Sequence, residues 1–190
     1  MDRLIFTAGS GAARSLSQQE IHANNLANVN TEGFRSDFDN AITQQVNGEG
    51  YASRYLAQPT QGSVDMAPGA ARETGRDLDI AIKGDGLIAL RSGNREVYTR
   101  NGQIDVNADG ELSVNGLPLE GDNGPIVLPP FSSVAIGDDG VITIVPEDGD
   151  IAAPMDIDRV KLVNIPANQL SKNQAGFLVT NAAFNPRDED

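Results

Sequence analysis

Residue types that commonly catalyse reactions or bind metals are scarce in this chain. It contains one histidine, His22, and no cysteine, which excludes disulfides and cysteine-ligated metals. A Ser-His-Asp triad would have to use His22, in the middle of a predicted helix. We expect that side chain to be exposed and to contact water or a neighbouring subunit instead.

Carboxylates are numerous, but their spacing does not indicate a site. Asp77 and Asp79 could flank a glycoside, yet aromatic residues make up only 5% of the chain and leave little for sugar stacking. Residues 105–110 match the first half of an EF-hand loop, but the last loop position is Gly116 instead of glutamate. We interpret this segment as a hairpin turn. The sequence thus predicts no catalytic, cofactor-binding or metal-binding residue, and a glycosidase is a minor alternative.

Residues 24–35 form the most distinctive stretch of the chain. Four asparagines, Asn24, Asn25, Asn28 and Asn30, are followed by Gly33, Phe34 and Arg35. Each amide offers two donors and an acceptor to the carbonyls that the last helical turn leaves unpaired. Ordinary helix capping explains part of this cluster. We favour a further role, in which another chain binds this stretch.

The segment before this stretch, residues 3–28, is predicted to be one amphipathic helix that Asp2 can cap. Its apolar positions have heptad-like spacing, with Gln19 in the one polar slot, which suits a coiled-coil seam. Gly9 and Gly11 each weaken a helix by about 1 kcal/mol relative to alanine, so this helix alone would be marginal in water. We therefore expect other chains to complete it. The predicted assembly interface consists of Ile5, Ala8, Ala12, Leu16, Ala23, Asn24, Asn25, Leu26, Ala27, Asn28, Thr31, Gly33, Phe34 and Arg35.

The pattern changes to short apolar runs separated by Gly, Asn and Asp turns after residue 48. Such runs with tight turns predict antiparallel strands. The predicted strands cover residues 78–82, 87–90, 97–99, 104–106, 112–114, 126–128, 134–136, 141–145, 160–165 and 177–180. The expected fold is mainly β with an N-terminal α-helix: a long amphipathic assembly helix plus an antiparallel β-sandwich or partly open barrel domain. The expected organisation is a helical assembly segment 1–46 with a second short helix over 36–46, an extended linker 47–76, a β domain 77–165 and a return segment 166–190.

The charge of the chain, −13, is concentrated in the β region. Between residues 101 and 158 there are twelve Asp and Glu and no Lys or Arg. The negative potential of this region argues against nucleic acid and anionic membrane surfaces as partners. We expect its carboxylates to lie on solvated turns. No apolar run has the length of a membrane span, and residues 4–13 would make a poor signal peptide because Gly9, Ser10 and Gly11 interrupt them.

Residues 23–35 resemble the N-terminal signature of the axial proteins of the bacterial flagellum, the rod and hook proteins. Four further blocks resemble the family in the same order: residues 77–86, 98–102, 124–129 and 159–163. The start, residues 1–8, is most similar to a proximal-rod member. The resemblance implies a structural subunit of the basal-body rod, with its helix packed lengthwise into the axial tube that transmits torque from motor to hook.

The resemblance also implies partners and a location. The partners would be other rod proteins, copies of this chain and the type III export apparatus. The location would be the periplasmic rod, which the chain would reach without a cleavable signal peptide. No cofactor and no direct membrane insertion are expected. The alternatives are a distal-rod protein of the same family and an extracellular β-rich binding module with a coiled-coil stalk.

The chain departs from the family pattern in two ways. Leu87 stands where members typically carry an aromatic residue. The chain also stops at Asp190 without the long C-terminal helix that pairs with the N-terminal one in the family, so we expect the sequence to be a fragment.

Overall fold

The computed structural model divides into two compact units, Met1–Asp65 and Met66–Asp190, each of which is described by itself. It is mainly β with an N-terminal helix, and its strands pair antiparallel, as predicted. No sheet of the described residues closes into a barrel. The described residues are 2–38, 41–45, 55–59, 63–67, 69–147, 153–173 and 175–180.

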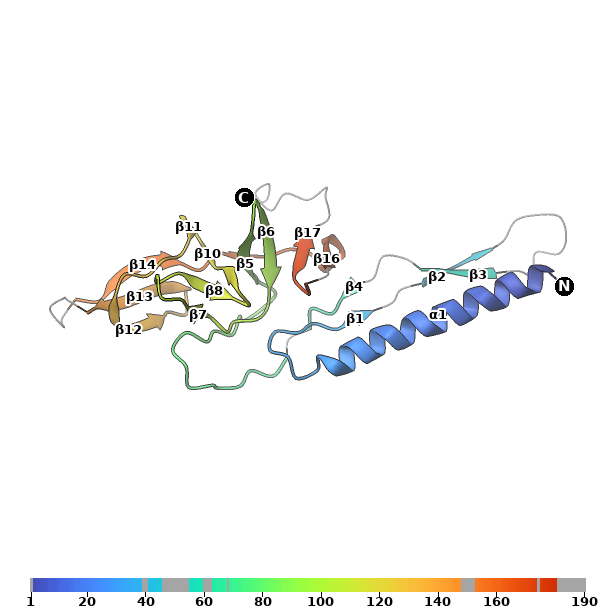
Figure 1. The fold of residues 1–190 in the computed structure, drawn as a ribbon, viewed down its shortest axis with the longest axis horizontal. Coiled ribbons are helices and arrows are strands. Elements are labelled where there is room, and N and C mark those ends of the chain that lie inside the picture. Colours follow the sequence, from blue (N-terminus) through green and yellow to red (C-terminus); the bar gives the residue numbers. More distant parts are fainter. Residues whose placement is uncertain are drawn as a thin grey trace. The chain divides into compact units, whose positions relative to one another are not determined.

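The first unit contains one helix and two short antiparallel sheets (Figure 1). The helix confirms the prediction for residues 3–28, and Asp2 is its first residue. It lies beside β3 and β1. The elements are α1 (Asp2–Ala27), β1 (Asp37–Phe38), β2 (Ala41–Gln45), β3 (Tyr55–Pro59) and β4 (Ser63–Val64), with β2 paired to β3 and β1 to β4.

The second short helix expected over residues 36–46 is wrong, because β1 and β2 occupy this segment. A short helix here would be costly to nucleate. The β-branched Ile42 and Thr43 favour a strand, and pairing with β3 supplies partners for the backbone amides. Strands β3 and β4 lie within residues 47–76, the expected linker.

The second unit is built from four antiparallel sheets. The largest has the order β15 (Leu162–Val163), β5 (Leu87–Ser92), β6 (Arg95–Thr99), β17 (Leu178–Thr180) and β16 (Leu170–Lys172). Two three-stranded sheets contain β12 (Phe131–Ile136), β13 (Val141–Pro146) and β14 (Met155–Arg159), and β7 (Asp105–Val106), β8 (Leu112–Val114) and β9 (Leu117–Pro118). A hairpin joins β10 (Glu120–Gly121) to β11 (Gly124–Pro125), and a 3₁₀ turn, η1 (Ala167–Gln169), precedes β16.

Turns in this unit use the predicted chemistry. Asn115 and Gly116, between β8 and β9, have φ angles of 51° and 77°, the two positive values that a type I′ turn requires. Residues 105–110 belong to the β7–β8 hairpin, which confirms the hairpin interpretation. The Asn107 side-chain oxygen stabilises that turn by accepting hydrogen bonds of 2.9 Å from the amides of Asp109 and Glu111.

Two segments predicted to be strands, residues 78–82 and 126–128, are not strands of the structure. Each instead joins its neighbours through an isolated bridge, Asp79 to Gln103 and Val127 to Glu111. Leu78, Ile80, Ile82, Ile126 and Leu128 still pack on the core, whereas Val127 is 53% exposed. The hydrophobic pattern therefore predicted burial for most of these positions but not the type of element.

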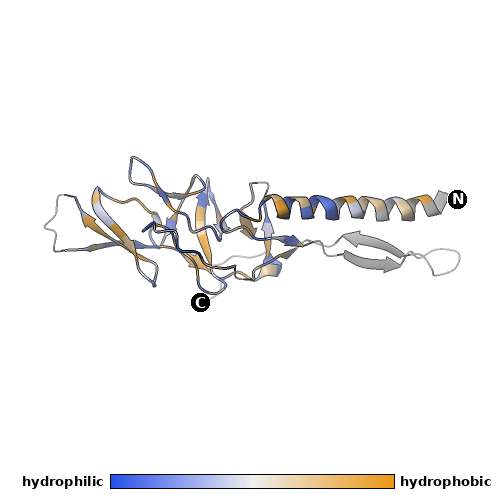
Figure 2. Cartoon of the chain, turned by 90° about the horizontal axis from the view of Figure 1, so that it is seen from below, coloured by the Kyte–Doolittle hydropathy of each residue, from blue (hydrophilic) through white to orange (hydrophobic). Residues whose placement is uncertain are grey.

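One hydrophobic cluster joins the sheets of the second unit. Its members come from β5, β6, β8, β13, the segments between them and Val160 after β14. Figure 2 shows apolar residues on many strands of the chain. Leu87, at the position of the family's aromatic, is fully buried. The cluster is Ile88, Leu90, Val97, Ile104, Leu112, Val114, Leu119, Ile126, Leu128, Ile142, Ile144 and Val160.

Most carboxylates of the acidic region are exposed, as expected. Exposed are Asp105, Asp109, Asp122, Asp138, Asp139, Glu147 and Asp156, while Glu111 and Asp158 are half-buried and Asp148 and Asp150 lie outside the described residues. Glu120 is the exception, because only 2% of it is exposed. Its carboxylate pairs with the Arg91 guanidinium, a cation from outside the acidic region. The expectation of solvated carboxylates is therefore wrong for Glu120.

Candidate functional site

The apolar positions of α1 that were predicted to form the assembly interface are exposed in this chain. Ile5, Leu16 and Leu26 have exposed fractions of 67%, 61% and 74%. Ala8, Ala12 and Ala23 are exposed as well, and we call these six residues the apolar stripe. Burial of each of the three large side chains would contribute about 1.5–3 kcal/mol. A row of exposed apolar residues on one helix marks a surface that another chain can cover.

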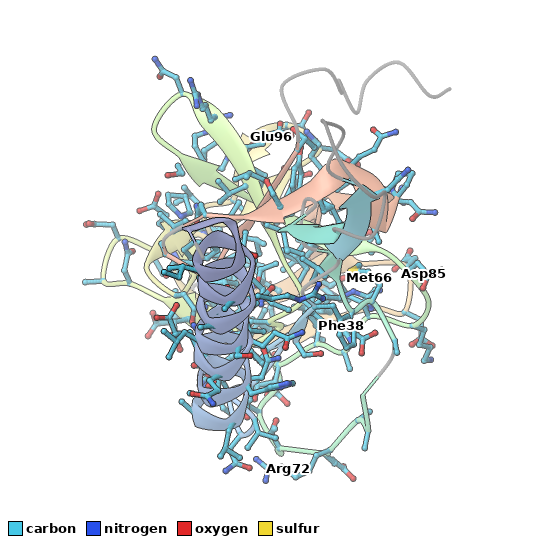
Figure 3. The ribbon with its side chains drawn as sticks, turned by 90° about the vertical axis from the view of Figure 1, so that its right-hand side faces the viewer. Phe38, Met66, Arg72, Asp85 and Glu96 are labelled. Atoms are coloured by element: carbon cyan, nitrogen blue, oxygen red, sulfur yellow. The ribbon has the colours of Figure 1, made fainter. Side chains whose placement is uncertain are left out.

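The opposite side of α1 is partly covered by the chain itself. The half-buried residues recur every three or four positions, so they share one face of the helix, and α1 lies beside β3 and β1. At about 100° per residue this face and the apolar stripe lie on roughly opposite sides of the helix. Figure 3, viewed along α1, shows side chains projecting all around it. This covered face consists of Ser10, Arg14, Gln18, Ile21, Asn25 and Asn28.

Within the asparagine cluster, the Asn28 side chain caps the end of α1. The Asn28 Nδ2 donates to the Asn24 carbonyl (3.0 Å) and to Asn24 Oδ1 (2.8 Å). Thr31 Oγ1 donates to Asn28 Oδ1 (3.5 Å), and the Thr31 amide to the Asn28 carbonyl (2.9 Å). Gly33, six residues after the last helical residue and with φ of 68°, lies in the turn that leads to β1. The Asn28 side chain therefore caps the helix within the chain, and Asn24 is its partner.

Asn25 binds a different target, the backbone of β1. Its Nδ2 donates to the Asp37 carbonyl, and its Oδ1 accepts from the Asp37 amide, both at 3.0 Å. The helix end and β1 are thus joined by one side chain across twelve residues of sequence. The sequence pointed to Asn25 through the asparagine cluster but gave no sign of its partner.

The remaining predicted interface residues divide by exposure. Ala27, Thr31 and Gly33 are exposed, whereas Phe34 and Arg35 are half-buried. The structure therefore brings the apolar stripe to an open surface and holds Asn25 and Asn28 by contacts within the chain. Assembly through the fourteen predicted residues stays a prediction.

The motif at residues 98–102 has a structural basis that the sequence did not reveal. Asn101 is 6% exposed; its Nδ2 donates to Asn115 Oδ1 (3.1 Å) and its Oδ1 accepts from the Gln103 amide (2.9 Å). A Cβ on Gly102 would lie 1.7 Å from the Ile80 carbonyl oxygen, so only glycine fits there. Asn101 and Asn115 are fourteen residues apart, which is why sequence spacing could not pair them.

An ion pair links β6 to the residue before β15. Lys161 Nζ lies 2.6 Å from Glu96 Oε1, and the Tyr98 hydroxyl donates to Glu96 Oε2 at 3.3 Å. Glu96 is labelled in Figure 3. The backbone of Lys161 also donates to the Glu120 carbonyl (2.9 Å) and accepts from the Ala89 amide (3.1 Å). These contacts hold together the sheet that carries the core.

The described residues contain no group of three or more His, Cys, Asp or Glu side chains that could hold a metal ion. Across that same part of the chain, α1 and η1 are too short or too polar to span a bilayer.

Comparisons with known proteins agree with this geometry. Residues 5–35 match the family described as "Flagella basal body rod protein", and residues 81–144 match the "Flagellar hook protein FlgE/F/G D1 domain". The flagellar basal-body rod protein FlgF of Salmonella typhimurium is 35% identical over 178 residues, which cover 93% of this chain and 71% of that protein. FlgF of Escherichia coli is 34% identical with the same coverage. The rod protein FlgG of Bacillus subtilis is 30% identical over 166 residues, 78% of this chain and 63% of that protein.

Proposed function

The chain belongs to the family of flagellar rod and hook axial proteins, and from this premise we propose that it is a structural subunit of the flagellar basal-body rod, in its proximal part. Its role is mechanical and not enzymatic, as in these relatives. The observation that carries the assignment is the similarity to FlgF over 93% of the chain, including the helix and the motif that follows it.

The apolar stripe is the proposed assembly surface. It is exposed, while the covered face of the same helix is half-buried within the chain. Alanines at three of its six positions allow close approach of backbones, and Ile5, Leu16 and Leu26 add apolar area. Heptad-like spacing suits lengthwise packing against helices of neighbouring subunits, in the manner of a coiled coil.

The second unit is proposed to supply the rigidity that torque transmission requires. Its sheets share one buried cluster, and its turns are held by glycines and by buried hydrogen bonds. Close-packed interiors transmit strain instead of absorbing it. A packed β unit, as a sandwich or as an open sheet arrangement, fits this purpose.

We propose other rod proteins and further copies of this chain as partners, and the flagellar export apparatus as a transient partner before assembly. The corresponding location is the periplasmic rod, reached without a cleavable signal peptide. The similarity to FlgG of Bacillus subtilis supports a second candidate, a distal-rod subunit. Complementation separates the two, because only the correct null strain should regain swimming.

The apolar stripe is tested by a matched pair of variants, Ala12→Asp and Ala13→Asp. Both positions are exposed, but only Ala12 belongs to the stripe. A carboxylate buried at a subunit contact would lack a partner, so Ala12→Asp should abolish incorporation into purified basal bodies and swimming. Ala13→Asp should assemble normally. Normal assembly of both variants would refute the stripe as the contact surface.

A further inference from the structure

We propose that Asn25 is a positioning residue, whose side-chain amide takes the place of a neighbouring strand on the edge of β1 that faces away from β4 and so sets the joint between helix and sheet. The proposal rests on the structural rod function and adds a residue-level device to it. Its basis is the pair of 3.0 Å hydrogen bonds between the Asn25 amide and the backbone of Asp37.

The pairing of β1 and β4 leaves this edge open to Asn25. Asp37 faces Val64 in the antiparallel register, and the Asp65 amide donates to the Ser36 carbonyl at 3.0 Å. In such a ladder the amide and carbonyl of one residue point to the same side, and sides alternate along the strand. Both groups of Asp37 are therefore directed away from β4, where the Asn25 amide meets them.

An asparagine side chain suits this role because its planar amide presents an N–H donor beside a carbonyl acceptor, the two kinds of group that a paired backbone offers. Alanine would supply neither group. Aspartate would still accept from the Asp37 amide but could not donate to its carbonyl. The two substitutions therefore remove different parts of the contact.

The contact closes residues 25–37 into a ring and fixes the segment that follows the helix. Leu26 and Val29, which are 74% and 65% exposed, lie in this ring. Asn25 itself is on the covered face, so it orients these apolar side chains without lying on the apolar stripe.

The first test is hydrogen exchange in the full chain, with Asn25→Ala, Asn25→Asp and the control Asn30→Ala, which removes an exposed asparagine of the same turn. Asn25→Ala should accelerate exchange of the Asp37 amide about tenfold, the size expected for losing such a hydrogen bond. Asn25→Asp should keep that amide protected. Asn30→Ala should change nothing. Unchanged exchange at Asp37 in Asn25→Ala, or unprotected exchange in the unaltered chain, overturns the proposal.

The second test measures rod incorporation and swimming of the same variants. Asn25→Ala should reduce both while the thermal melt of the second unit stays unchanged, Asn25→Asp should have an intermediate effect, and Asn30→Ala should behave as the unaltered chain. Faster exchange with normal incorporation would refute the positioning role and leave the rod function standing. The rod function fails separately, if the unaltered chain is absent from basal bodies.

Discussion

At the scale of single residues, several asparagines and one glycine make contacts that require their residue type. Asn25 pairs with backbone, Asn28 caps a helix, and Asn101 is buried in a hydrogen-bonded turn. Gly102 lies too close to the backbone of Ile80 for any side chain to fit. The Ile80 amide donates a hydrogen bond to the Gly102 carbonyl at 3.0 Å, and a Cβ on Gly102 would collide with the Ile80 carbonyl oxygen. Resemblance to a family located these residues, and geometry explains why their types are required.

Gly102→Ala should destabilise the second unit by about 1–3 kcal/mol, the usual cost of inserting a methyl group into a packed site. The added Cβ would collide with the Ile80 carbonyl oxygen, which is backbone and cannot rotate away. Chemical denaturation measures the difference. Gly69→Ala is the control, because its Cβ would have no atom within 4 Å, and an equal loss in both variants would contradict the account.

At the scale of elements, sequence periodicity predicted the elements that depend on neighbouring residues. It failed for a strand whose pairing partner is distant in the sequence. The heptad-like spacing predicted α1 almost to its ends. The Asn115-Gly116 pair indicated the turn that the structure shows between β8 and β9. The segment 36–46 was predicted to be a short helix around Phe38 and Ile42, and this failed because β3, the partner of β2, begins ten residues after β2 ends. The candidate site was predicted as a list of residues, but the division of α1 into a covered face and an exposed stripe required the structure.

The β2–β3 hairpin is expected to support α1, since the two lie side by side and the helix alone would be marginal. Thr43→Pro removes a backbone donor from β2, opposite Ala57 of β3, and proline is poorly tolerated within paired strands. The helical circular dichroism signal of the full chain should fall, while Thr43→Val should preserve it. An unchanged helical signal in Thr43→Pro would show that α1 does not depend on the hairpin.

At the scale of the whole molecule, the chain divides into a unit that carries α1 and an acidic β unit. The exposed carboxylates of the second unit face solvent, and two of them form exposed ion pairs, Lys83 with Asp138 at 3.5 Å and Arg76 with Asp105 at 3.0 Å. Exposed pairs of this kind contribute little. Self-repulsion among the carboxylates is therefore expected to outweigh such contacts at low ionic strength.

Neutralising three exposed carboxylates, by Asp138→Asn, Asp139→Asn and Glu147→Gln together, should raise the melting temperature slightly at low salt. The gain should disappear at high salt, where the charges are screened. Rod assembly should be unaffected, because these side chains are solvated. Loss of assembly with an unchanged melt would instead reveal a basic partner at this surface.

The central claim is that this chain is a rod subunit that packs through the apolar stripe of α1. The most direct test is an electron cryo-microscopy map of basal bodies from cells that carry this chain as the sole copy of its gene. We predict that the chain can be traced in the proximal rod, with Ala12, Leu16 and Leu26 buried against neighbouring subunits. Absence of the chain from the rod, or a stripe that faces solvent within it, would contradict the account.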